Sequence, residues 1–154
     1  MQIRSVSIND INAIVDIHLD AFKGFFLTSL GPAFLRFYYT CFVKSDETVT
    51  MVAEEDGVIC GFAAATTKCK GFNSRLIKNN LLSFGVLTLK MLFTSPRSLL
   101  RLIKNLTKKS ESVQDDEDYA ELYSIGVSIA AQGRGIGKQL LNATVSATKM
   151  GGRE

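Results

Sequence analysis

A glycine-rich turn, Gln-Gly-Arg-Gly-Ile-Gly-Lys at residues 132–138, has the composition of an anion-binding site. An apolar run at residues 123–127 precedes it, and a helical pattern of apolar residues follows it. Glycines let backbone N–H groups approach a phosphate closely, and the first turn of a helix adds partial positive charge. We therefore expect a phosphate-binding turn between a strand and a helix.

Two common nucleotide-binding motifs do not fit this turn. A Walker A loop needs Ser or Thr after its lysine, whereas Lys138 is followed by Gln139. A dinucleotide fingerprint needs G-x-G-x-x-G spacing in the first βα unit, and Gly133, Gly135 and Gly137 are spaced differently. The remaining alternative is a tight turn that binds no ligand, which three glycines and two cationic residues within seven positions disfavour.

The first third of the chain predicts the elements that support this turn. Residues 3–8 alternate in the manner of a short strand, and residues 11–22 have the apolar spacing of an amphipathic helix. His18 lies on the apolar face of that helix, where a core histidine is a commoner role than catalysis. Residues 23–30 are expected to be irregular, and Pro32 to begin a second, largely buried helix.

A hairpin is expected next. Two β-branched and apolar runs, at residues 48–53 and 58–66, are separated by a turn that ends in Asp56-Gly57. Gly61, inside the second run, predicts a bulge or a close backbone approach.

Residues 70–118 predict a helical insertion that ends in an acidic loop. Apolar residues from Leu76 to Phe93 indicate one or two helices with Gly85 as a weak point, and Ser95-Pro96 predicts the start of another. That last helix is amphipathic and basic, which suits either a membrane surface or, the expectation preferred here, packing on its own domain. The run at residues 110–118 is acidic and is expected to be a loop.

Composition places the chain among ordinary globular proteins. It has 154 residues, 46% hydrophobic and 21% charged, and a net charge of +3, which tolerates an anionic ligand but does not indicate nucleic-acid binding. Cys41, Cys60 and Cys69 show no paired spacing, so neither disulfides nor a metal site are expected. The N-terminus has no signal-peptide pattern, and the apolar stretch at residues 81–93 is short for a bilayer. We expect a single cytoplasmic domain, 1–154, with no membrane partner.

The residues around the turn resemble a known family. Gln132-Gly133-Arg134-Gly135-Ile136-Gly137 matches the Q/R-x-x-G-x-G/A signature of the GNAT N-acetyltransferase superfamily, and the order of the preceding elements is similar too. Residues 129–131 depart from the proline, acidic and aromatic residues that many members have there. The resemblance implies an α/β fold (an α+β mixed sheet) ordered strand-helix-helix-strand-strand-insertion-strand-helix, with the family's C-terminal strands missing.

The same resemblance implies acetyl-coenzyme A as co-substrate. The family binds its pyrophosphate with backbone N–H groups of the glycine turn, and its pantetheine along the preceding strand, as an added strand pairs with a sheet edge. Carried over to this sequence, the strand residues are Ile125, Gly126 and Val127, and the turn residues are Gln132, Gly133, Arg134, Gly135, Ile136, Gly137 and Lys138.

Acetyl transfer to an amine also needs a base that removes a proton from the ammonium. Glu121 is the candidate, because some members of the family have a glutamate at this strand position. It lies six residues before Val127, an even offset that predicts one shared strand face. Tyr123, on that face, is expected to position the amine or relay a proton through water. A solvated carboxylate with no catalytic role is the alternative for Glu121.

The family's usual general acid is a tyrosine after the next strand, beyond residue 154. We therefore expect this chain to be a fragment, and a partner that supplies the remainder is the alternative. The acceptor is expected to be a small-molecule primary amine with an apolar part, bound between residues 23–30, the second helix and the insertion, with Phe25, Phe26 and Tyr38 in its wall. A protein or peptide amine is the enzymatic alternative, and a non-catalytic acyl-coenzyme A sensor is another. A homodimer is left open.

Overall fold

Four strands form one antiparallel sheet with the order β1-β2-β3-β4, and its two central strands are rich in β-branched and apolar residues. The computed structural model describes residues 1–107 and 119–151. Within them the elements are β1 (Gln2–Ser5), η1 (Ile8–Asp10), α1 (Ile11–Ala21), α2 (Phe26–Ser29), α3 (Pro32–Lys44), β2 (Thr48–Glu55), β3 (Val58–Thr66), α4 (Phe72–Asn79), α5 (Leu81–Thr94), α6 (Pro96–Thr107), β4 (Glu121–Val127), η2 (Ile129–Ala131) and α7 (Ile136–Gly151).

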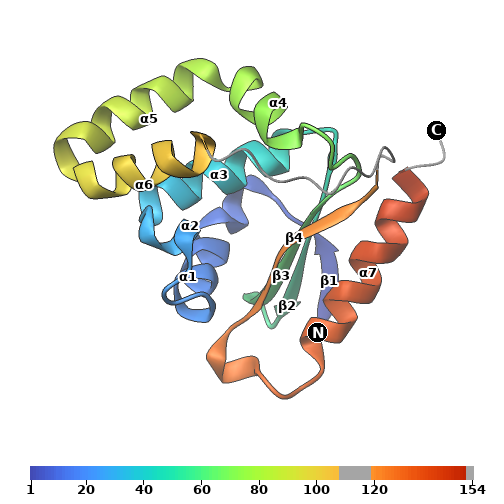
Figure 1. Ribbon diagram of the computed structural model, residues 1–154. Coiled ribbons are helices and arrows are strands. Elements are labelled where there is room, and N and C mark those ends of the chain that lie inside the picture. The colour runs from blue at the N-terminus through green and yellow to red at the C-terminus, as the bar shows by residue number, and fades with distance from the viewer. Residues whose placement is uncertain (108–118, 152–154) are drawn as a thin grey trace.

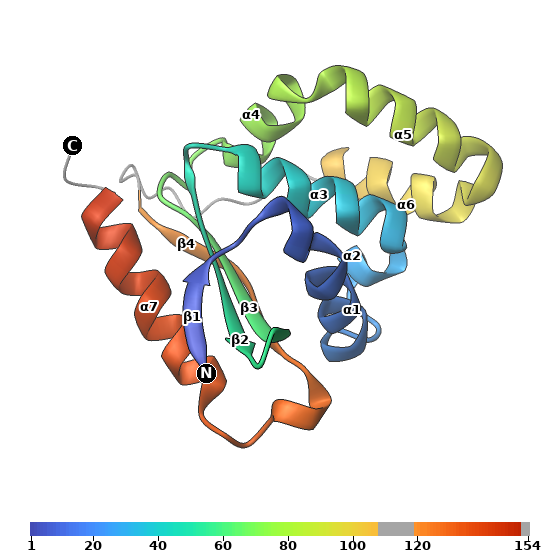
Figure 2. The same cartoon turned by 180° about the vertical axis from the view of Figure 1, so that it is seen from behind.

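The two faces of the sheet are covered by different helices (Figures 1 and 2). On one face α1 and α3 pack against Val52, Phe62 and Ala64 of the central strands. On the other face α7 packs its Ile136 and Leu140 against small residues of β2 and β3. The order of elements implied by the family resemblance is therefore confirmed, and the glycine turn lies where β4 leads into α7.

The hairpin and the close approach at Gly61 are confirmed. Asp56 and Gly57 both have positive φ, 51° and 78°, as a two-residue hairpin turn requires. The β2–β3 register shifts where Ala53 pairs with Gly61 and Glu54 pairs with Ile59, which leaves a bulge. A Cβ atom at Gly61 would lie 3.0 Å from Leu140 Cδ1. A side chain at this position would therefore press on α7, and glycine lets the helix pack closely on the sheet.

The insertion is helical, but its break differs from the expected one. α5 runs without interruption through Gly85, and the chain turns at Asn80, where α4 meets α5. Asn80 Nδ2 donates a hydrogen bond of 2.8 Å to the Leu76 carbonyl. In a continuing helix that carbonyl would accept from the backbone N–H of residue 80, so the side chain replaces the lost backbone bond. Residues 23–30 are also more regular than expected, because α2 forms there.

The insertion packs on the sequence before it through a separate apolar cluster. Leu30 and Phe34 meet Met91 and Leu102 there, which ties α5 and α6 to α3 and the end of α2. The Ser98 hydroxyl donates to the Ser29 carbonyl at 3.0 Å. The expected acidic loop, residues 110–118, lies outside the described residues.

Membrane-spanning length is reached by no single helix of the described chain. Taken together, α4 and α5 have the length and apolar composition of a membrane span, but the two helices are bent by 87° at their junction.

Candidate active site

The glycine turn between η2 and α7 presents backbone donors. Gly133 and Gly135 have φ values of +78° and +76°, a conformation that other residues adopt only with strain. The first helical bond runs from the Gln139 N–H to the Gly135 carbonyl at 3.2 Å. The N–H groups of Ile136, Gly137 and Lys138 therefore precede the helical ladder and have no partner within it. This arrangement suits an anion at the start of α7.

The glycines of the turn differ in why they are needed. An added Cβ at Gly133 or Gly135 would meet no atom within 4 Å, so these two glycines are needed for their backbone conformation. At Gly137 an added Cβ would be 3.8 Å from Val127 Cγ2, an ordinary contact. The fold therefore tolerates a side chain at Gly137.

Arg134 does not point its charge at an open site. Its guanidinium donates two hydrogen bonds, of 2.7 and 2.8 Å, to the two carboxylate oxygens of Glu55 at the end of β2. This contact lowers the pKa of Glu55 and raises that of Arg134. Arg134 thus joins the turn to the hairpin. The other cation of the motif, Lys138, is exposed and is therefore available to a ligand.

Strand β4 has one partner strand. It pairs with β3 from Gly61–Val127 to Thr66–Glu121, and it ends the strand order of the described sheet. Its other edge is available for a ligand that binds as an added strand. Near the end of this strand Gln132 Nε2 donates to the Val127 carbonyl at 3.3 Å, which ties the turn to the strand end.

A bulge in β4 changes which side chains share a face. Ser124 pairs with Ala64 and Leu122 pairs with Ala65, so Tyr123 is an extra residue in the strand. Ile125 and Val127 pack in the cluster under α7, whereas Tyr123 packs against the cluster under α1 and α3. The expected face shared by Glu121 and Val127 is therefore wrong, because the extra residue reverses the alternation between them.

Glu121 lies exposed at the start of β4, beside the segment that follows β3. The thiol of Cys69 donates a hydrogen bond of 2.6 Å to Glu121 Oε2. Sequence reasoning missed this contact, because 52 residues separate the two positions and no pattern links them. The carboxylate is accessible to water, as a general base that acts through a water molecule requires.

Tyr123 is half-buried and held by aromatic rings. The rings of Phe42 and Phe72 contact it edge-on, with centroids 5.4 and 5.5 Å away. Burial raises the pKa of the Tyr123 phenol, and the nearby Glu121 charge raises it further. Tyr123 therefore keeps its proton at neutral pH and is a hydrogen-bond donor.

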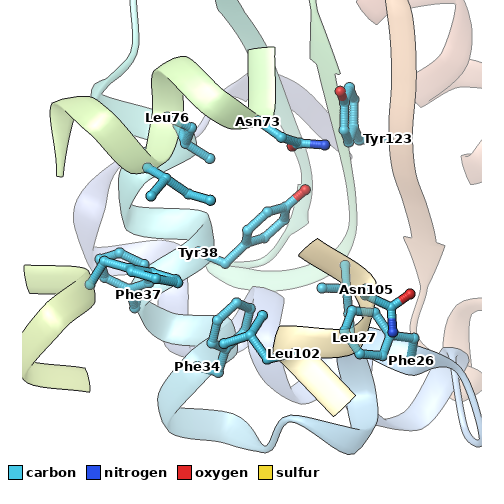
Figure 3. A pocket seen from close by; sticks show the side chains of 12 residues that line it. Phe26, Leu27, Phe34, Phe37, Tyr38, Asn73, Leu76, Leu102, Asn105 and Tyr123 are labelled. Carbon is cyan, nitrogen blue, oxygen red and sulfur yellow. The ribbon is translucent and has the colours of Figure 1, made fainter. Parts of the chain in front are cut away.

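A cavity of about 300 Å³ lies beside Tyr123, under the insertion (Figure 3). Apolar side chains from α2 to α6 form most of its wall, and the Tyr38 hydroxyl points toward the end where Asn73 and Tyr123 lie. Burial raises the pKa of Tyr38, so it too stays protonated. The lining residues are Phe26, Leu27, Phe34, Phe37, Tyr38, Asn73, Leu76, Ile77, Phe84, Leu102, Asn105 and Tyr123.

The cavity agrees in part with the expected acceptor wall. Phe26 and Tyr38 line it, whereas Phe25 is 64% exposed and is not among the residues that line this cavity. Phe25 precedes α2 and its ring packs edge-on against Phe22 of the preceding loop. Sequence reasoning did not identify Asn73 and Asn105, since single polar residues on amphipathic helices carry no signal of a shared cavity.

His18 is part of the core, as expected. It is 2% exposed, and its Nδ1 atom lies 2.7 Å from the Tyr39 hydroxyl. Burial lowers the pKa of His18 to about 4, so the ring is neutral at physiological pH. Among the described residues, no group of three or more His, Cys, Asp or Glu side chains is placed to hold a metal ion.

Comparisons with known proteins agree with this architecture. The sequence model described as "Acetyltransferase (GNAT) family" matches residues 11–151. A search of curated protein sequences gives no significant match.

Several solved structures are similar in fold. Aminoglycoside antibiotic 6'-N-acetyltransferase AAC(6')-IG from Acinetobacter haemolyticus aligns with a TM-score of 0.59 at 9% identity, over 97% of this chain and 72% of its own. Ribosomal-protein-alanine N-acetyltransferase from Brucella melitensis aligns with 0.57 at 17% identity, over 97% and 68%. A protein reported as histone acetyltransferase HPA2 and related acetyltransferase from Corynebacterium glutamicum aligns with 0.57 at 19%, over 95% and 70%. At these identities the likeness concerns the fold alone.

Proposed function

Because the chain belongs to the GNAT acetyltransferase family, we propose that it transfers an acetyl group from acetyl-coenzyme A to a primary amine of a small molecule that has an apolar part. The observation that carries the acceptor class is the cavity under the insertion, which is mostly apolar and has Tyr38, Asn73 and Tyr123 at one end. A cavity of this kind binds a compact apolar group and orients a polar one.

The co-substrate is proposed to bind across the β4–α7 junction. The pyrophosphate accepts hydrogen bonds from the N–H groups of the turn at residues 133–138, where the start of α7 favours negative charge. The pantetheine amides pair with the open edge of β4 at Ile125, Gly126 and Val127. The thioester then reaches the bulge at Tyr123, on the side of the strand that borders the cavity.

The proposed chemistry is direct attack of the amine on the thioester carbonyl. Glu121 takes a proton from the ammonium through a water molecule, so that the nitrogen lone pair is free to attack. Tyr123, which keeps its proton, donates a hydrogen bond that positions the amine or its water relay. The new C–N bond forms as the C–S bond breaks, and coenzyme A leaves as the thiolate, which then takes up a proton.

A protein or peptide amine is the second candidate acceptor. The exposure of Glu121 at the strand start favours it, because a bulky acceptor reaches an exposed base more easily than a buried one. One structural neighbour is named as a ribosomal-protein-alanine N-acetyltransferase. The two acceptor classes differ in whether the cavity is filled.

The test combines calorimetric binding of acetyl-coenzyme A with release of coenzyme A thiol in the presence of amines. A panel of small aromatic and aliphatic amines is compared with peptides that have a free N-terminus or a lysine. Faster release with apolar small amines supports the proposal, and faster release with peptides supports the second candidate. Binding without turnover on any amine would indicate a sensor, and absence of binding would overturn all three.

A further inference from the structure

The outer surface of α5 and α6 is apolar and unusually exposed. Leu82 and Phe93 are 85% and 81% exposed, and the other members of this surface are Leu81, Val86, Leu89, Leu92, Leu100 and Ile103. We call these eight residues the outer apolar surface. The same two helices pack on the domain through other residues, among them Met91 and Leu102. Soluble monomers seldom expose so many large apolar side chains together.

The outer apolar surface is continuous across the two helices. Two shallow apolar grooves show this, one along α5 from Leu81 to Leu89, and one between the helices lined by Leu89, Leu92 and Ile103. Figures 1 and 2 place α5 at the edge of the molecule, with its outer side directed away from the sheet and from α7. A flat partner can therefore reach it without contacting the glycine turn.

Charge around this surface has one sign. From residue 81 to residue 107, which spans α5 and α6, the sequence has four Lys or Arg residues and no Asp or Glu. The two helices therefore have a net charge of +4, whereas the rest of the chain, with fourteen cationic and fifteen acidic residues, has −1. Arg97 and Arg101 are one helical turn apart on α6 and both are exposed, beside Leu100.

We propose that the outer apolar surface docks on an anionic lipid bilayer, with the apolar side chains in the interface and the Lys and Arg residues at the headgroups. An apolar helix face flanked by cations is the pattern of interfacial helices, and anionic lipids supply the complementary charge. A second copy of the chain fits less well, because pairing the outer apolar surfaces of two copies would bring two pairs of helices together, each with a net charge of +4. This proposal is independent of the acceptor and of catalysis.

The test is sedimentation of the whole chain with lipid vesicles. Vesicles of phosphatidylcholine alone are compared with vesicles of phosphatidylcholine and phosphatidylglycerol at about 2:1, at low and physiological salt. The chain is expected to sediment with the anionic vesicles only, and less so at higher salt. A chain that stays in the supernatant with both kinds of vesicle overturns the proposal.

Variants separate the two contributions. Arg97→Gln with Arg101→Gln is expected to lower the partition coefficient about 30-fold, since each cation near an anionic surface contributes roughly fivefold. Leu82→Ser with Phe93→Ser is expected to lower it at least about tenfold. The control is Val58→Ser with Met150→Ser, which removes comparably exposed apolar side chains elsewhere and is expected to bind as the unmodified chain does.

Two outcomes would overturn the proposal even if some sedimentation is seen. If Leu82→Ser with Phe93→Ser and the control double variant bind equally, the outer apolar surface is not the contact. If ultracentrifugation shows a dimer that Leu82→Ser with Phe93→Ser dissociates, and vesicles recruit no protein, the surface joins two copies of the chain. Circular dichroism of each variant checks that these exposed substitutions leave the fold intact.

Discussion

The Cys69 thiol and the Glu121 carboxylate meet at 2.6 Å, which joins the segment after β3 to the first residue of β4. The contact fixes one carboxylate oxygen and leaves the other for a water molecule. It also places the proposed base beside Tyr123, whose raised pKa is due in part to the Glu121 charge. The base, the phenol and the end of the cavity thus lie together at the bulge of β4.

Replacing Glu121 tests its role as the base. Glu121→Gln keeps the shape of the side chain and its contact with Cys69 but removes the proton acceptor, so kcat/KM for the amine is expected to fall by roughly 10²–10⁴-fold. Binding of acetyl-coenzyme A should be unchanged in calorimetry. The control is Asp16→Asn, an exposed carboxylate on α1. Equal rates for Glu121→Gln and the unmodified chain would leave Glu121 as a solvated strand-end carboxylate.

Two glycines of the turn are expected to respond differently to alanine. Gly135→Ala forces a side chain into a backbone with φ +76°, and should lower the free energy of unfolding by about 1–2 kcal/mol. Gly137→Ala lies in α7 with room for its Cβ, and should raise it by about 0.5–1 kcal/mol. Both should weaken acetyl-coenzyme A binding if the pyrophosphate lies there. Chemical denaturation and calorimetry measure the two effects.

The control for backbone strain is Gly24→Ala. Gly24 has φ +83° and open space around it, but it lies in the loop after α1 and not in the turn. It should lose stability as Gly135→Ala does and bind acetyl-coenzyme A normally. A stable Gly137→Ala variant with unchanged affinity would show that the pyrophosphate does not approach the start of α7.

The sequence predicts the regular part of this fold well because its signals are local. Asp56-Gly57 is required by the positive φ values of the hairpin, and Pro32 begins α3 where a missing N–H costs nothing. The glycine turn is recognisable for the same reason, since φ values near +77° and an open helix start depend on a few adjacent residues.

What the sequence does not predict depends on contacts between distant residues. The bulge at Tyr123 depends on how β4 pairs with β3. Regular strand alternation, which ignores the bulge, therefore predicted one shared face for Glu121 and Val127. The position of Arg134 in the motif suggests a cation that binds a ligand, yet Glu55, 79 residues away, accepts its hydrogen bonds. Gly85 suggests a break in the helix, yet the chain turns at Asn80, whose side chain donates a hydrogen bond to the Leu76 carbonyl.

Filling the cavity should change acceptor selection without affecting the co-substrate. Asn73 is exposed on α4 and lines the cavity, so Asn73→Phe adds volume there at little cost to folding. KM for bulky apolar amines is expected to rise about tenfold or more, while affinity for acetyl-coenzyme A stays constant. Ser74→Phe, on the same helix but outside the lining set, should leave KM unchanged. Equal KM values for both variants would remove the cavity from the acceptor site.

His18 should make stability depend on pH in a specific window. Its pKa of about 4 in the folded chain lies below the ordinary 6.5, so on acidification the unfolded chain takes up a proton first. The contribution of neutral His18 to the free energy of unfolding is therefore fully present above about pH 6.5. It is lost as pH falls toward about 4, which lowers the free energy of unfolding by up to about 3 kcal/mol. The Arg4 contact lowers the pKa of Asp10 to about 2, so protonation of Asp10 reduces stability only below about pH 4.

The measurement is urea denaturation at several pH values between 7 and 4.5, for the unmodified chain and His18→Gln. Glutamine does not titrate, so the variant should show a smaller fall in its free energy of unfolding across this range. The unmodified chain should also be the more stable of the two at pH 7, because its ring packs against Phe22 and Phe62. Parallel pH dependences would mean that the histidine titrates alike in the folded and unfolded chains, contrary to its burial beside Tyr39.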